Sequence, residues 1–118
     1  MPLVPVADDD ADLRDLLAVK LQQGGLDVIA AGTGQAALDQ ARDHRPALAL
    51  LDVSLPGLSG IDVCRMLRAD PATARMLIML TARAPEQDVP GAYDWVTKPY
   101  SPRALVARIQ ELLKSLLN

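Results

Sequence analysis

Two patterns of apolar residues alternate along this chain. Short runs rich in apolar residues are separated by longer stretches in which leucine, isoleucine or alanine recurs every three or four positions. Short apolar runs are typical of buried strands, and the wider spacing is typical of helices with one inward face. The runs that predict strands are residues 3–7, 26–30, 47–51, 76–80 and 93–96.

Helices are predicted in the stretches between these strands. The first helix holds leucines at helical spacing and stops at two glycines, which commonly follow a helix. The next two begin after a threonine or a serine, and the last begins with a Ser-Pro pair, all favoured N-terminal residues. These boundary residues are Gly24 and Gly25, Thr33, Ser59, and Ser101 with Pro102. In the last helix we expect four residues to face inward: Leu105, Ile109, Leu112 and Leu116.

Strands that alternate with helices predict an α/β fold, in which a parallel sheet carries helices on both faces. The carboxyl ends of parallel strands meet at one edge, where ligands usually bind. Four of the five predicted strands deliver polar residues to this edge: Asp8 and Asp9, Asp52, Thr81 and Lys98. Each has an ordinary explanation as a turn residue, a helix-start acid or a surface lysine. Their joint arrangement favours a functional site.

Length and composition narrow the class of protein. A chain of 118 residues with 50% hydrophobic and 23% charged residues matches one globular domain, which we expect to span residues 1–118. The formal charge of −3 and the dispersed basic residues do not suggest nucleic-acid binding. No apolar run approaches the roughly 20 residues of a membrane span. The lone Cys64 and the absence of a signal-like start favour the cytoplasm.

Three carboxylates at one sheet edge repel one another. At about 4 Å and an effective dielectric constant near 20, each pair costs about 4 kcal/mol, so either protons or a cation must join them. A hard divalent ion with oxygen ligands, such as Mg²⁺, suits the second choice. A nearby lysine and hydroxyl would complete an anion site. Together these groups are typical of phosphoryl transfer, with Asp52 as the nucleophile and an aspartyl phosphate as the intermediate.

Four motifs give the chain a resemblance to a known family. They are VADDDADLR, LLDVSLPGLSG, MLTA and VTKPY, in this order. They resemble the motifs of bacterial response-regulator receiver domains, the CheY-like superfamily of two-component systems. The resemblance implies a flavodoxin-like, five-stranded parallel sheet in the order 2-1-3-4-5. It also implies phosphorylation by a sensor histidine kinase or a phosphotransfer protein and control of a downstream effector, with no contact of this domain with nucleic acid or membrane.

The resemblance also implies a role for each site residue. Mg²⁺ or Mn²⁺ would be held by Asp9, Asp52 and the backbone carbonyl of Ser54, with Asp8 acting through water. Thr81 and Lys98 would bind the phosphoryl oxygens. The residues implied to tune the lifetime of the phosphoryl group are Ser54 and Arg83, and Asp10 is expected to be peripheral.

The sequence departs from the family pattern in three places. Pro5 lies in a strand that the family places inside the sheet, so we expect irregular pairing at its start. The segment from Thr81 to Lys98 is about five residues short, more than one helical turn, and contains Pro85 and Pro90. We therefore expect the family's fourth helix to be shortened or missing. Trp95 stands where the family usually has Tyr or Phe as part of its switch, so it either fits an enlarged pocket or blocks the switch.

These features are compatible with three functions. The favoured one is a phosphoacceptor switch that catalyses only its own phosphorylation and dephosphorylation, and is otherwise not an enzyme. The alternative is a degenerate receiver that docks a partner without being phosphorylated, which the short segment and Trp95 favour. A hydrolase acting through an aspartyl phosphate would need a second acid two positions after the nucleophile, where this chain has Ser54.

Overall fold

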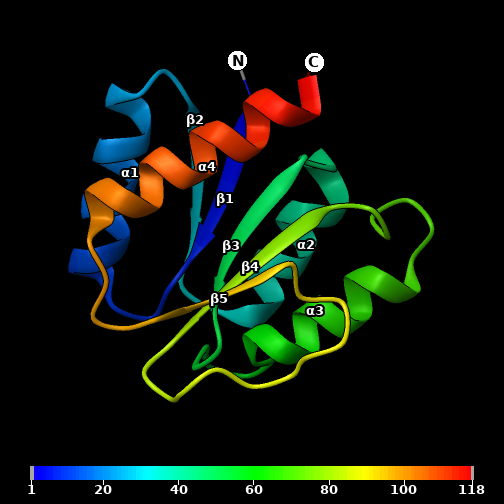
Figure 1. Ribbon diagram of the computed structural model, residues 1–118. Helices are drawn as coiled ribbons and strands as arrows, with labels where there is room; N and C mark the ends of the chain where they lie inside the picture. The colour runs from blue at the N-terminus through cyan, green and yellow to red at the C-terminus, as the bar shows by residue number, and fades with distance from the viewer. Residues whose placement is uncertain (1, 118) are drawn as a thin grey trace.

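Strands and helices alternate along the chain in the computed structural model, which describes residues 2–117 (Figure 1). In chain order the described elements are β1 (Leu3–Ala7), α1 (Ala11–Gln23), β2 (Asp27–Ala31), α2 (Gly34–His44), β3 (Leu48–Asp52), α3 (Gly60–Ala69), β4 (Leu77–Ala82), β5 (Asp94–Thr97) and α4 (Pro102–Leu117). The predicted alternation is confirmed. Most strands begin and end one or two residues later than the apolar runs, so Asp52 and Thr81 lie within strands rather than after them.

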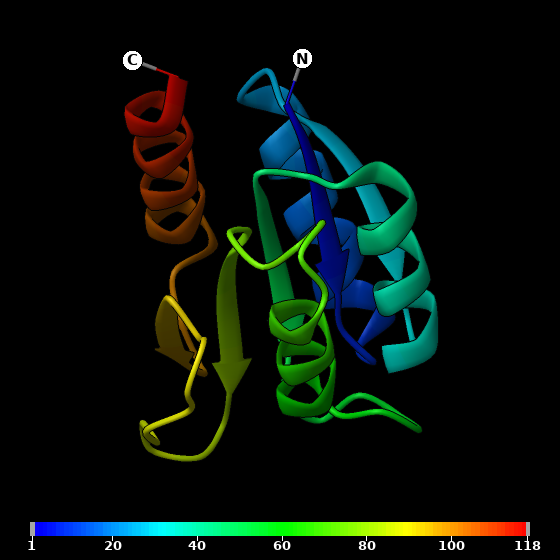
Figure 2. The same ribbon diagram turned by 90° about the vertical axis from the view of Figure 1, so that its right-hand side faces the viewer.

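The five strands form one parallel sheet in the order β2-β1-β3-β4-β5, as predicted. Helices α1 and α4 cover one face and α2 and α3 cover the other (Figure 2). All five residues of β3 are buried, which explains why its sequence shows no alternation. The start of β1 and the end of α4 lie at the same end of the molecule, opposite the carboxyl ends of the strands (Figures 1 and 2).

Polar side chains fix the starts of the four described helices. The Asp10 carboxylate accepts from the backbone N–H groups of Asp12 and Leu13 and caps α1. Thr33 caps α2 in the same way. In α3 the Ser59 hydroxyl and the Asp62 carboxylate each accept from the other residue's backbone N–H, forming a capping box. At the start of α4 the Ser101 hydroxyl accepts from the backbone N–H of Ala104. Thr33, Ser59 and Ser101 were all predicted to begin these helices.

Pro5 leaves a local defect in the sheet interior. Strand β1 pairs with β2 along its whole length, but it pairs with β3 only at Val6 and Ala7. Proline has no N–H to donate to a ladder, so the loss of pairing at this point follows from its chemistry. The expected irregular start of the strand is therefore present, and the fold is unchanged.

No helix lies between β4 and β5 within residues 2–117, as the short segment predicted. Two side chains tie this connection to the rest of the molecule. The Arg68 guanidinium donates to the carbonyl oxygens of Gly91, at 2.8 Å, and Ala74, at 3.0 Å. The Trp95 indole N–H donates to the Ala84 carbonyl oxygen at 3.3 Å.

The inward face of α4 differs from the predicted one. Leu105, Ile109 and Leu113 are buried, whereas Leu116 is 51% exposed and Leu112 is only partly buried. The prediction of Leu116 as an inward residue was therefore wrong, because paired leucines fit two helical phases and packing on α1 and the sheet selects one. None of the helices within residues 2–117 is long and apolar enough to cross a membrane.

Candidate functional site

The carboxyl edge of the sheet gathers most of the predicted site residues. Asp8 follows β1 directly, and Asp52 ends β3. Thr81 of β4 lies opposite Asp52 in the strand register and is almost fully buried. Lys98 follows β5, where its backbone N–H donates to the Ala82 carbonyl oxygen. Four segments far apart in the sequence therefore meet at one place.

Lys98 links two of the buried carboxylates. Its ammonium group lies 2.9 Å from Oδ2 of Asp8 and 3.0 Å from Oδ2 of Asp52. Asp8 and Asp52 are 2% and 3% exposed, so both carboxylates are largely removed from water. Their remaining oxygens accept from backbone N–H groups, Asp8 Oδ1 from Asp10 and Asp52 Oδ1 from Ser54. The site is thus held in place by a network of hydrogen bonds.

The pKa values of Lys98 and Asp52 reflect this crowding. Burial would lower the pKa of Lys98, but its bonds to Asp8 and Asp52 outweigh burial and raise it. Burial raises the pKa of Asp52, aided by the negative charge of Asp8, even though Lys98 and the Ser54 N–H oppose that rise. Lys98 therefore does not fully offset the cost of burying the Asp52 carboxylate next to Asp8.

Asp9 supplies a third carboxylate to the same place. Oxygen atoms of Asp8, Asp9 and Asp52 lie within 4.8 Å of one another, and Asp9 is exposed to solvent. Carboxylate oxygens, with one group open to water, are the donors that Mg²⁺ takes in proteins. The excess negative charge at this point fits a divalent cation. The neighbouring Asp10 lies outside this group of three, and its carboxylate caps α1.

The other predicted residues lie around this cluster. Ser54 and Arg83 line a cavity of about 210 Å³ together with Asp9, Asp10, Asp52 and Lys98. Trp95 lies outside that lining, opposite Leu80 in the strand register, and its half-buried ring packs on the α2–α3 side of the sheet. Thr81 and Trp95 thus lie on the neighbouring strands β4 and β5, and neither lines the cavity over Asp52.

Sequence reasoning missed Tyr100 and Leu13. With Arg83, Lys98 and Pro99 they line a second cavity of about 400 Å³ beside the carboxylates. Burial raises the pKa of Tyr100, as do the charges of Asp8 and Asp52, and its buried hydroxyl makes no hydrogen bond within the described residues. Tyr100 ends the VTKPY motif, but nothing in the pattern shows that its ring forms a cavity wall.

A parallel sheet in the order 2-1-3-4-5, with acids and a lysine at its carboxyl edge, defines the flavodoxin-like class of CheY-like proteins. Residues 4–110 match the family model described as the response regulator receiver domain. The chain belongs to that family.

Known relatives agree with this assignment. The chain is 45% identical over 114 residues to the DNA-binding response regulator MtrA of Mycobacterium tuberculosis strain H37Rv, covering 92% of this chain and 49% of the relative. It is 41% identical over 115 residues to the phosphate regulon transcriptional regulatory protein PhoB of Pseudomonas aeruginosa, covering 92% and 50%. The chain therefore spans about half the length of the curated relatives it matches.

Solved structures show the same fold. The receiver domain of the Francisella response regulator 1452 superposes with a TM-score of 0.89 at 25% identity, covering 98% of this chain and 99% of that one. The chemotaxis response regulator CheY4 of Vibrio cholerae superposes with a TM-score of 0.85 at 25% identity, covering 94% and 98%.

Proposed function

We propose that this chain, as one domain over residues 1–118, accepts a phosphoryl group on Asp52 and thereby changes its affinity for a partner. The observation that carries the proposal is the position of the Asp52 carboxylate, buried at the sheet edge between Lys98 and the acids Asp8 and Asp9. The phosphodonor would be a phosphohistidine of a sensor kinase or phosphotransfer protein. Family membership supports this choice of donor.

The reaction at Asp52 needs few groups of the chain itself. A carboxylate oxygen of Asp52 would form a bond to phosphorus while the bond between phosphorus and the donor nitrogen breaks. Lys98 already contacts Asp52 and would stay close to the new phosphoryl oxygens. Asp9, Asp52 and the Ser54 carbonyl would hold Mg²⁺ or Mn²⁺, and Asp8 would act through water. When bound, the metal supplies positive charge for the carboxylates and the phosphoryl oxygens.

Thr81, Trp95, Ser54 and Arg83 would act after the transfer. We infer that Thr81 binds a phosphoryl oxygen and that Trp95 responds to its movement, because the two residues lie on neighbouring strands beside Asp52. Ser54 and Arg83 line the cavity over Asp52 and would limit the approach of water, which sets the lifetime of the phosphoryl group.

The proposed role is regulatory. We propose that the domain catalyses only its own phosphorylation and dephosphorylation. We also propose that it works in the cytoplasm, where kinases are phosphorylated by ATP. A downstream effector would read the change. MtrA and PhoB are named as DNA-binding or transcriptional regulators, so we propose a DNA-binding effector for this receiver, with no DNA contact by the receiver itself.

Intact mass tests the proposal. After incubation with Mg²⁺ and acetyl phosphate we expect one added phosphoryl group, which is absent in Asp52→Ala and absent when EDTA replaces Mg²⁺. The matched control is Asp62→Ala, which removes an aspartate that caps α3 and lies outside the acidic cluster. An unmodified mass with several donors would favour the phosphorylation-independent docking module.

A further inference from the structure

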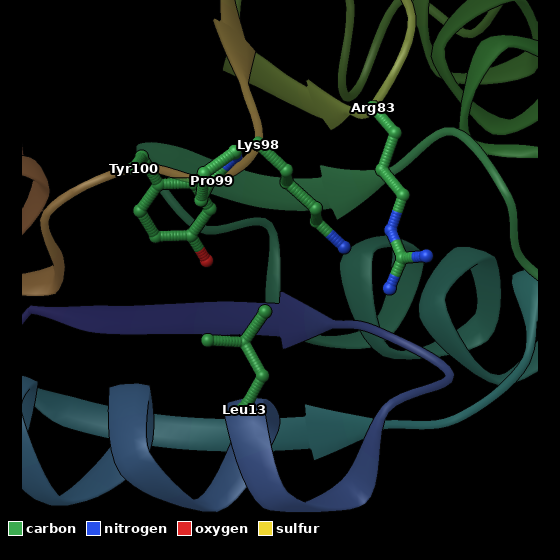
Figure 3. Close-up of a pocket in the computed structure, with 5 residues that line it drawn as sticks. All are labelled: Leu13, Arg83, Lys98, Pro99 and Tyr100. Carbon is green, nitrogen blue, oxygen red and sulfur yellow. The ribbon is translucent and has the colours of Figure 1, made fainter.

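The cavity beside Lys98 has no ligand in the proposed function, because the phosphoryl group and the metal ion would lie at the carboxylates of Asp9 and Asp52, which line the smaller cavity. The volume of the cavity beside Lys98, about 400 Å³, falls in the range of small-molecule pockets. Figure 3 shows Leu13 reaching into it from α1, Pro99 and the ring of Tyr100 on the segment that follows β5, Lys98 just before them, and Arg83 just after β4. Three of its five lining residues are therefore apolar or aromatic, and the two cations stand on one side.

This cavity shares two lining residues with the smaller one over Asp52. Lys98 and Arg83 line both, so they form the border between the phosphoacceptor and the apolar walls. A donor with its phosphorus at Asp52 would reach the larger cavity by extending its leaving group past these two side chains. The apolar surface on that side is formed by Leu13, Pro99 and Tyr100.

We propose that this cavity binds the leaving group of a small acyl phosphate, so that the domain prefers donors with an aromatic acyl group over acetyl phosphate. The inference rests on the proposed phosphorylation of Asp52 and names a substrate class for that site. An acetyl group offers one methyl to the apolar walls, whereas a benzoyl group offers a ring. Burying the equivalent of two more methylene groups corresponds to about tenfold in binding.

The transfer balances without another reactant. One carboxylate oxygen of Asp52 forms a bond to phosphorus, and the bond between phosphorus and the benzoate oxygen breaks. Benzoate leaves with that electron pair as an anion, so no proton has to be supplied. The positive charge of Arg83, on the border of the cavity, favours the benzoate anion as it departs.

The test compares initial rates of phosphorylation, followed by intact mass, with benzoyl phosphate and acetyl phosphate at equal low concentrations. The two donors differ in intrinsic reactivity, so the measured quantity is the ratio of their rates in each variant. Leu13→Gln removes an apolar wall and should lower the benzoyl-to-acetyl ratio about tenfold. Leu16→Gln is the matched control, because Leu16 is on the same helix, is 42% exposed and does not line the cavity.

The outcomes separate this inference from the proposed function. If both donors modify Asp52 and the ratio is the same in wild type, Leu13→Gln and Leu16→Gln, the cavity does not hold the leaving group and the inference is overturned. If neither donor modifies Asp52 at any concentration, the proposed function fails and the inference falls with it. A ratio that drops only in Leu13→Gln supports both.

Discussion

Neighbouring aspartates in this chain have different tasks, which their positions at the start of α1 decide. Asp8 is buried against Lys98, Asp9 is exposed within the carboxylate cluster, and Asp10 caps the helix. A run of three acids reads as one feature in the sequence. In the structure, successive side chains point in different directions, and only the first two belong to the candidate metal site.

Substitution of Asp9 and Asp10 should separate metal binding from helix capping. We expect Mg²⁺ to raise the melting temperature of the wild type. At a Mg²⁺ concentration one hundred times the dissociation constant, the free energy of unfolding should increase by about 2.7 kcal/mol. Asp9→Ala should lose much of this response. Asp10→Ala should keep it but lose about 1 kcal/mol of stability with or without metal, because α1 loses its cap. Thermal melts with Mg²⁺ and with EDTA measure both effects, and equal Mg²⁺ responses in the two variants would rule out the site.

Asp52 should make the metal-free protein sensitive to pH. Its native pKa lies above the ordinary value of 3.8, so the unfolded chain loses this proton at a lower pH than the native protein does. The stability contributed by the protonated group is present below 3.8 and is lost as pH rises through the native pKa.

Asp52→Asn removes this titration. In EDTA at pH 7 we expect the variant to resist urea better than the wild type, with the advantage shrinking as the pH falls toward 4. Urea midpoints across this pH range measure the difference. A variant that is less stable than the wild type at neutral pH would mean that the ion pair with Lys98 outweighs burial and the charge of Asp8.

At the scale of elements, where the family has a helix, β4 and β5 are joined by an irregular connection. Its ends are held by Arg68 at Gly91 and by Trp95 at Ala84, and Gly91 has a positive φ of 91° that suits glycine. Between these ties, the backbone N–H groups of residues 84–91 donate no hydrogen bond within the described structure. The segment is therefore positioned by side chains rather than by a ladder of its own.

Hydrogen exchange should reveal this difference. Amides of residues 84–91 should exchange faster than those of the other connections, because little protects them. Arg68→Leu should loosen the segment further and cost about 1–3 kcal/mol, since the carbonyl oxygens of Ala74 and Gly91 lose their donor. Arg65→Leu, a change on the exposed surface of the same helix, is the control. Slow exchange across residues 84–91 would show a protected structure there.

For the whole molecule, the proposed switch depends on coupling between Asp52 and Trp95 across β4. Asp52 lies opposite Thr81, and Trp95 lies opposite Leu80, the residue before it. A shift of Thr81 toward a phosphoryl group would open space next to the half-buried indole. The bond from its N–H to Ala84 would then extend the effect to the β4–β5 connection.

Emission of Trp95, the only tryptophan, should report this coupling. Phosphorylation with Mg²⁺ should bury the indole and shift its emission to the blue, and the shift should reverse as the acyl phosphate hydrolyses. Thr81→Ala should reduce the shift while the mass still shows the phosphoryl group. A fixed spectrum in a phosphorylated wild type would exclude Trp95 from the mechanism and indicate a blocked switch.

Most of the fold and the acidic site could be predicted because both depend on short, ordered motifs. The missing helix was visible as too few residues between Thr81 and Lys98. The buried face of α4 could not be predicted fully. Adjacent leucines such as Leu112 and Leu113 allow two possible inward faces, and only packing in the folded protein selects one. The cavity beside Tyr100 was also hidden, since it forms between α1 and the β5–α4 connection, which only the folded chain brings together.

The start of β1 and the end of α4 share the end of the molecule that faces away from Asp52 (Figure 2). A tag or a solid support attached at either terminus would thus stand on the far side from the acidic cluster. Immobilised copies would present that cluster outward in a common orientation, so a kinase in free solution could reach it. The geometry suits a surface-bound sensor that reports phosphorylation through its single indole.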